Sequence, residues 1–386
     1  MNTYCTSVIP IRIGQKDFTG IVLGEGIKKK LLHQYENYVG DLNLLSIPDI
    51  NLNQSNIFFI PSEMMDIQCV VCDNTLSLIL TWKKVYKNYY NLINDSLTRR
   101  NKLVKDILNY KSDDENLSQF LALLSRNKDK GISINYAFTF YSIYDKNYED
   151  AYEKHIKVLA EPSLINMDDM LSSANIKLYN NKTVINEDAL NNINNIDICS
   201  GQKTYVTWAS IVSLSLDKNL FLKNHITMTL LEIIVQKIWN LCYTQNSELN
   251  NSITNIKSLT KNININKLII ETYRILIESK NCISATYSSR ISGLHQSIIE
   301  SSQLTKITGD LEQKLNYLIV FTNTINQGKN KNIQESSEIM LFLIAIAQVI
   351  PIFFSLPIIT HLIISILTVV GISLIGIIII RNKYRM

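Results

Sequence analysis

The feature that most limits how this chain can fold is a run of 42 residues without Asp, Glu, Lys or Arg, from Ile339 to Ile380. A helix needs about 20 mostly apolar residues to cross a bilayer, so the run is long enough for two spans. Pro357 interrupts it, because proline lacks a backbone donor and disfavours helix at the residue before it. The sequence therefore predicts a C-terminal hairpin of two transmembrane helices, near 338–355 and 361–380.

Basic residues on both flanks of this run predict its orientation. Lys329 and Lys331 precede it, and Arg381, Lys383 and Arg385 follow it. Because Lys and Arg are enriched on the cytoplasmic side of membrane proteins, both termini are expected in the cytosol. The predicted localisation is the inner (cytoplasmic) membrane, as a multi-pass protein. The alternative is a helical hairpin buried inside a globular core.

A polar stripe follows the first predicted span. Its positions are separated by 3 or 4 residues and share one helical face: Gln334, Glu338, Leu341, Ala345, Gln348, Ile352 and Ser355. Polar side chains are costly against lipid, so the stripe is expected to line a pore, with Glu338 at its cytosolic mouth. The alternative is a contact between Gln348 side chains that holds a non-conducting oligomer together.

Apolar residues recur mostly every 3 or 4 positions between Ile291 and Ile325, upstream of the apolar run. This spacing is typical of a long amphipathic helix. We therefore expect a nearly continuous helix from about Ala285 into the first span. It either transmits a cytosolic rearrangement to the membrane or serves only as a stalk.

These patterns divide the chain into three regions. A cytosolic α/β domain is expected over 1–216, a helical bundle with the stalk helix over 217–335, and the transmembrane hairpin with its basic tail over 336–386. The bundle begins with helices predicted at 217–245 and 267–280, where apolar residues follow the helical repeat.

The first region mixes strand and helix patterns. Alternating or continuous apolar runs predict strands at 67–72, 76–82, 132–143 and 203–214, and a helix is predicted over 83–110. Strands and helices mixed in this way predict an α/β fold.

Aromatic residues are dense in the predicted strands near 132–144 and 203–214. A packed sheet accounts for such a pattern. The alternative is a pocket in which aromatic rings stack on a planar ligand while a basic side chain meets its phosphate. The candidate ligand-binding residues are Arg12, Tyr136, Lys203 and Trp208.

Patterns that carry catalytic or metal chemistry are sparse. Cys69-Val-Val-Cys72 is a single CxxC without a second pair at zinc-like spacing, and the five histidines are dispersed. The net charge of +4 is spread along the chain without a basic stripe, which argues against direct nucleic-acid binding. No catalytic residue and no metal site is predicted, and the chain is not expected to be an enzyme.

The order of these regions resembles the CorA-like family of two-transmembrane divalent-cation channels. Thr204–Ser210 is similar to the strand before the helical part of that family, and Glu338–Phe354 to its first span. The resemblance implies a homo-oligomer, a pentamer in that family, whose first span lines a pore through the lipid bilayer. One departure is large: Phe354–Thr360 stands where the family carries Gly-Met-Asn, its outer selectivity ring.

The missing motif argues against ordinary Mg²⁺ uptake. CorA-like proteins with degenerate hairpins accompany type III CRISPR systems as membrane effectors that respond to a nucleotide messenger such as SAM-AMP, and this chain resembles them. The expected function is an oligomeric channel opened by such a nucleotide in the cytosolic domain, permeabilising the membrane in antiviral defence. The alternatives are a divergent Mg²⁺/Co²⁺ transporter, with the divalent cation as ligand, and a non-conducting membrane scaffold.

Overall fold

A computed structural model describes residues 1–12, 57–60, 62, 65–72, 75–126, 133–134, 137–164, 179–180, 185–197, 201–254, 264–285 and 289–353, and the single positions 363, 366, 367 and 371. The chain divides into two compact units, Met1–Glu312 and Gln313–Met386. All the strands described below belong to the first unit.

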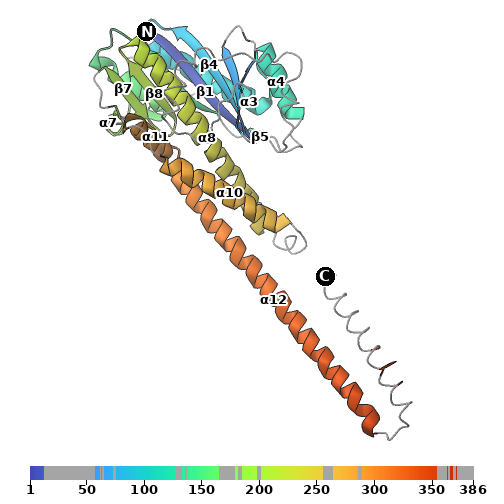
Figure 1. The fold of residues 1–386 in the computed structure, drawn as a ribbon. Helices are drawn as coiled ribbons and strands as arrows, with labels where there is room; N and C mark the ends of the chain where they lie inside the picture. Colours follow the sequence, from blue (N-terminus) through green and yellow to red (C-terminus); the bar gives the residue numbers. More distant parts are fainter. Residues whose placement is uncertain are drawn as a thin grey trace. The chain divides into compact units, whose positions relative to one another are not determined.

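Within the described residues, eight strands form one mixed sheet (Figure 1). They are β1 (Asn2–Arg12), β2 (Ile57–Ile60), β3 (Asp66–Cys72), β4 (Thr75–Val85), β5 (Ser133–Ile134), β6 (Phe138–Tyr144), β7 (Gln202–Val206) and β8 (Ser210–Ser215). The order is β2-β3-β4-β1-β6-β8-β7, and β5 pairs with β1. β6 and β8 are parallel, while the other neighbours are antiparallel. β7 therefore lies at one edge of the sheet.

Eight α-helices are described along the chain. They are α3 (Tyr89–Asn109), α4 (Glu115–Arg126), α5 (Glu153–Ala160), α7 (Glu187–Asn191), α8 (Lys218–Thr254), α10 (Asn264–Ser284), α11 (Ser289–Ser301) and α12 (Leu304–Phe353). The start of α8 is set by Asp217, whose Oδ1 accepts hydrogen bonds from the backbone N–H groups of Asn219 and Leu220 at 2.8 and 2.9 Å. An Asp in this position satisfies donors that the first helical turn leaves free.

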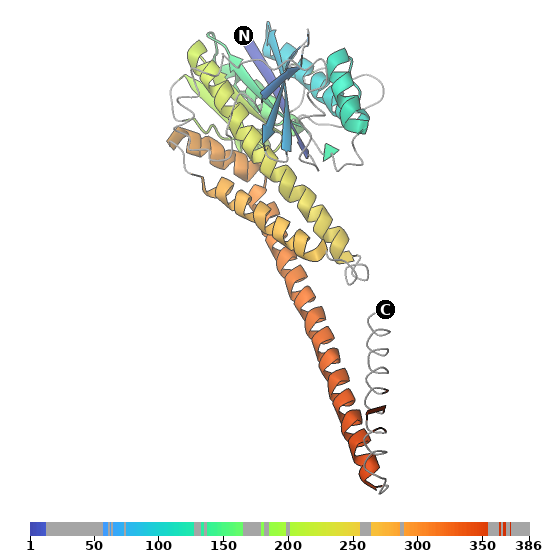
Figure 2. The ribbon, with the colours of Figure 1, turned by 45° about the vertical axis from the view of Figure 1, so that its right-hand side comes forward.

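The alternation of side chains along β1 assigns each face of the sheet to a different helical layer. Cys5, Ile9 and Ile11 belong to apolar clusters shared with α3, α4 and α5. On the opposite face, the Tyr4 ring meets Phe221 of α8 with ring centroids 4.8 Å apart. Figure 2 shows α4 in teal and α8 in yellow-green on opposite sides of the sheet. The first unit thus has three layers, helices on both faces of a sheet, which is a mixed α/β fold.

His225 of α8 is buried against β1 and β6. The Ser142 hydroxyl and Nδ1 of His225 are 3.1 Å apart, and the imidazole lies edge-on to the Tyr4 ring at 5.1 Å. Burial lowers the pKa of His225 to about 3, because the charged imidazolium would lose its hydration. The sheet face under α8 is therefore built around a neutral histidine.

The predicted transmembrane hairpin is not confirmed by the structure. Among the residues that the structure describes, no helix combines the length and the apolar character needed to cross a membrane. Most of the second predicted span, 361–380, lies outside the described residues. The finding contradicts the predicted fold class in its membrane part, and with it the membrane-protein and ion-channel assignment and the multi-pass localisation.

Two predicted elements are each divided in the structure. The strand predicted over 203–214 is the antiparallel pair β7 and β8, joined by a turn at residues 207–209. The helix predicted from about Ala285 onward is two helices, α11 and α12, separated at Ser302 and Gln303. Both breaks occur without glycine or proline, which is why the apolar spacing alone did not indicate them.

Candidate functional site

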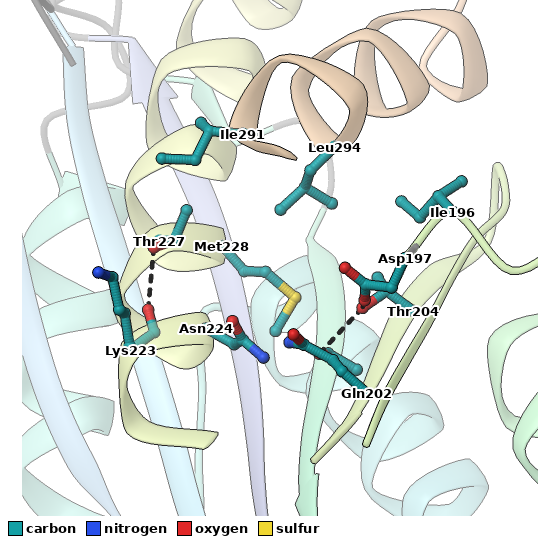
Figure 3. A pocket seen from close by; sticks show the side chains of 11 residues that line it. Ile196, Asp197, Gln202, Thr204, Lys223, Asn224, Thr227, Met228, Ile291 and Leu294 are labelled. Carbon is teal, nitrogen blue, oxygen red and sulfur yellow. Dashed lines mark hydrogen bonds between the residues drawn. The ribbon is translucent and has the colours of Figure 1, made fainter. Parts of the chain in front are cut away.

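A cavity of about 160 Å³ lies where the edge of the sheet meets α8 and α11 (Figure 3). Its walls come from the segment before β7, from β7 and β8, from the first turns of α8 and from α11. The lining residues are Ile196, Asp197, Gln202, Thr204, Ser213, Lys223, Asn224, Thr227, Met228, Ile291 and Leu294. The cavity therefore joins the α/β layers to the helix that directly precedes α12.

Buried, neutral polar side chains form one part of this lining. Gln202, Thr204, Ser213 and Asn224 are all buried. Oγ1 of Thr204 and Oγ of Ser213 lie 3.1 Å apart at hydrogen-bond distance, and Nδ2 of Asn224 donates to Ser215 Oγ at 3.1 Å. Amides and hydroxyls held in this way present both donors and acceptors. Such a surface suits a neutral polar group better than a bare anion.

The two charged lining residues are more accessible and opposite in sign. Asp197 is half-buried and accepts a hydrogen bond from the Thr204 hydroxyl, while Lys223 on α8 is exposed. The backbone of the Asp197 segment is held by Asn195, whose Oδ1 accepts from the Asp197 N–H at 3.2 Å. Phosphate sites usually gather several Arg, Lys or backbone N–H groups. One acid and one base do not make such a site.

α11 contributes the half-buried apolar side chains of Ile291 and Leu294 to the cavity. The helix ends at a junction where Gln303 has a φ of 53°, a left-handed conformation that is uncommon for residues other than glycine. Trp239 of α8 fixes this junction, because its Nε1–H donates to the Ser302 carbonyl at 2.9 Å. The same long helix, α8, thus lines the cavity and holds the start of α12.

Lys203, predicted to meet a ligand phosphate, is already neutralised by carboxylates. Its Nζ lies 2.7 Å from Asp150 Oδ1 and 3.1 Å from Glu153 Oε2, and 5.3 Å from the ring centroid of Tyr148. Partial burial disfavours the charged ammonium, but the hydrogen bonds to Asp150 and Glu153 outweigh it and raise the pKa of Lys203. A phosphate would have to compete with two acids for this lysine.

Of the other predicted ligand residues, the structure describes Trp208 and the backbone of Arg12. Trp208 lies in the turn between β7 and β8 with 68% of its surface exposed. Arg12 is the last residue of β1, paired with Thr75 and Ser133, and Tyr136 lies outside the described residues. The described part of this set therefore shows no shared pocket, and a ligand site formed by all four residues stays a prediction.

The predicted polar stripe lies on α12 as far as the structure describes it. Gln334 and Glu338 are exposed, and Nε2 of Gln334 donates to Glu338 Oε1 at 3.0 Å. Leu341 and Ala345 are exposed too, Gln348 and Ile352 fall within the bounds of α12, and Ser355 lies outside the described residues. Whether these residues line a pore stays a prediction.

The residues that do form the cavity were missed from the sequence. Asp197 lies in an Asn-rich stretch, and Asn224 and Met228 sit in a helix pattern where they look like ordinary helix residues. More than 60 residues separate Met228 from Ile291, so no spacing rule connects them. In the described part of the chain no three His, Cys, Asp or Glu side chains are grouped to hold a metal ion.

Comparisons of the chain with protein-family models, with curated proteins and with solved structures gave no match.

Proposed function

We propose that this chain is a ligand-responsive regulatory protein. A small molecule binds the cavity between β7, α8 and α11 and changes the packing of α11, and hence the α11–α12 junction. One observation carries the proposal: the residues of α11 that line the cavity, Ile291 and Leu294, belong to the short helix that ends directly at this junction. A ligand cannot fill the cavity without touching α11.

The lining favours a planar, neutral, hydrogen-bonding group as the part of the ligand that enters. Gln202 and Asn224 offer amide donors and acceptors, and Met228 supplies a polarisable apolar surface. About 160 Å³ is below the roughly 300–1,000 Å³ of sites for drug-sized ligands, so the cavity admits a fragment of nucleobase size. A nucleotide messenger fits if its base enters and its phosphates stay outside, near Lys223.

α8 connects ligand binding to the junction. Asn246, two turns after Trp239, donates from Nδ2 to the Ile307 carbonyl in the first turns of α12 at 3.2 Å. Trp239 and Asn246 thus hold both sides of the junction to one rigid helix. A displacement of α11 against α8 is expected to strain these contacts. Ligand binding should therefore change the backbone conformation or hydrogen bonding at residues 302–307.

The sequence also predicted a channel, a divalent-cation transporter and a membrane scaffold. Each of these depends on the two predicted membrane spans, so the proposal keeps only the ligand-sensing part of the expected function. The absence of catalysis stays a prediction, as do the homo-oligomer and the role in antiviral defence.

Calorimetric titration of the full chain with adenosine, guanosine, AMP and SAM-AMP tests the proposal. We expect at least one to bind, and hydrogen exchange at residues 289–312 to slow in the complex. Leu294→Trp should abolish binding, because the larger ring occupies the cavity. Gln296→Trp is the matched control, since Gln296 is exposed on the same helix and does not line the cavity.

Two outcomes contradict the proposal. If no nucleoside or nucleotide binds, the cavity is not a site for this class of ligand. If binding survives Leu294→Trp unchanged while the variant melts like the wild type, the ligand occupies another place.

A further inference from the structure

A second cavity, of about 230 Å³, lies on the opposite face of the sheet from α8, between α3, β4 and the start of α4. It shares no residue with the cavity at α11. The lining residues are Met65, Trp82, Asp95, Arg99, Lys102, Leu103, Asp106, Ser112, Asp113, Asp114 and Leu117. Five of them, at positions 95, 99, 102, 103 and 106, lie on α3 at spacings that place them on one helical face.

Arg99 supplies a hydrogen-bonding fork at one end of this face. Its Nε donates to Asp95 Oδ2 at 2.8 Å, and its guanidinium carbon lies 5.9 Å from the centroid of the Trp82 ring. Contacts of Arg99 with other described residues therefore use Nε and the face of the group, not Nη1 and Nη2. A planar guanidinium whose Nε and ring-facing side are already in contact can bind a carboxylate through two hydrogen bonds from Nη1 and Nη2.

Asp106 supplies a carboxyl group at the other end. Among the described residues it forms no ion pair, and its side chain accepts a hydrogen bond from Ser112. Burial raises the pKa of this carboxyl, which means that its charge is poorly compensated by its surroundings. A cation placed beside Asp106 would supply the missing compensation.

The other charged side chains that line the cavity form ion pairs or cap a helix. Asp95 also pairs with Lys84 at 3.2 Å, and Lys102 pairs with Asp113. Asp114 caps α4, accepting from the Leu117 N–H at 2.9 Å. Among the described residues, the groups of this cavity without an opposite charge bound to them are therefore the terminal nitrogens of Arg99 and the carboxyl of Asp106, which accepts only a neutral hydrogen bond from Ser112.

An apolar surface separates these two ends. Leu103 lies between Arg99 and Asp106 on α3 and is buried, and Leu117 of α4 is also buried. Arg99 and Asp106 are seven residues apart, which places their Cα atoms roughly 10 Å apart along the helix axis. A ligand that uses both ends must therefore carry its two charges on a chain of several carbon atoms.

We propose that this cavity binds an ω-amino carboxylate, a zwitterion with a carboxylate and an ammonium group at opposite ends of a short methylene chain. The carboxylate binds Nη1 and Nη2 of Arg99, the ammonium group binds Asp106, and the methylenes pack on Leu103 and Leu117. Free lysine and a C-terminal lysine of a peptide present the same chemistry. The proposal is independent of the function proposed for the cavity at α11.

Calorimetric titration of the full chain with 6-aminohexanoate, hexanoate and hexylammonium tests the proposal. We expect 6-aminohexanoate to bind at least about tenfold more tightly than either singly charged analogue, because each end contributes a charge-assisted hydrogen bond. Arg99→Lys keeps the charge but removes the fork, and it should weaken binding by about tenfold or more. Asp106→Asn should do the same for 6-aminohexanoate and leave hexanoate unchanged.

Arg274→Lys is the matched control, because Arg274 is exposed and pairs with Glu278 on α10, away from the cavity. It should leave binding unchanged. Equal binding of hexanoate and 6-aminohexanoate would reduce the site to an anion site, and equal binding of hexylammonium would reduce it to a cation site. Either result, or no heat with any of the three compounds, overturns the proposal.

Discussion

The substitution Glu232→Gln is expected to stabilise the protein, and increasingly so as the pH rises. Glu232 lies in the middle of α8 and is fully buried. One carboxyl oxygen, Oε2, accepts a hydrogen bond from Gln236 Nε2 at 2.7 Å, and the other, Oε1, has no partner among the described residues. Burial raises the pKa of Glu232 to about 8 from an ordinary value of 4.5, although the bond from Gln236 favours the ionised form.

Proton linkage determines how the stability contributed by Glu232 changes with pH. Between pH 4.5 and 8 the unfolded chain loses this proton while the folded chain keeps it. The contribution of Glu232 to stability is therefore complete below pH 4.5 and is lost as the pH rises through the folded value. The free energy of unfolding falls by about 1.4 kcal/mol per pH unit between these two pKa values. At neutral pH the ionisable carboxyl therefore lowers the free energy of unfolding by about 3 kcal/mol. Gln has the same shape, keeps an acceptor for Gln236 and cannot ionise.

Urea unfolding of both proteins, followed by circular dichroism at about pH 5, 6 and 7, measures the effect. We expect the free energy of unfolding of the variant, minus that of the wild type, to rise by about 1–1.4 kcal/mol per pH unit over this range. Taking the difference removes the contributions of the buried histidines, which both proteins share. A difference that does not change with pH would refute the reasoning, because Glu232 would then be equally ionised in the folded and unfolded chains.

Three further predictions concern α8 and the junction that it holds. Because the pKa of His225 is lowered to about 3 in the fold, its contribution to stability is present above about pH 6.5 and is lost on acidification; His225→Gln should flatten the fall in melting temperature between about pH 6.5 and 4. Trp239→Phe removes the bond to Ser302 and should lower the free energy of unfolding, measured in urea, by about 1 kcal/mol. Gln303→Val should cost about 1–2 kcal/mol in thermal melts, since a β-branched residue is strained at a φ of 53°, whereas Gln303→Gly should be tolerated.

Local apolar patterns were sufficient to predict several elements of the sheet and the helices. The strands predicted at 67–72 and 76–82 are confirmed as β3 and β4, and the helix predicted over 217–245 as most of α8. These segments repeat their apolar residues with the period of the element they form, and their burial agrees with it. The period is a local property, so the sequence carries it directly.

The hairpin of β7 and β8 shows where such patterns fail. Its turn is made by Thr207, whose Oγ1 accepts from the backbone N–H groups of Ala209 and Ser210 at 3.2 and 3.3 Å. A threonine that turns the chain through its hydroxyl has the same strand propensity as any other threonine. The turn also explains Trp208, which lies inside the strand predicted over 203–214 and is exposed at the tip of the hairpin.

The candidate site could not be predicted from the sequence for a different reason. The sequence can show that Lys203 is basic, but not that Asp150 and Glu153 are folded against it. Likewise the closeness of Asn224 and Leu294 depends on how α11 packs on α8.

α8 makes two kinds of contact, and the difference matters for the proposed function. Its first half packs on the sheet mainly with apolar and aromatic side chains, to which Asn224 and His225 add hydrogen-bonding contacts with Ser215 and Ser142. Its second half uses directional polar bonds: Trp239 and Asn246 donate to backbone carbonyls, and Nε2 of Gln245 donates to Thr272 Oγ1 of α10 at 2.8 Å. A buried polar group that loses its partner costs about 1–3 kcal/mol, so these bonds fix one register of the helices. A ligand that moves α11 must therefore either break such a bond or carry the junction with it.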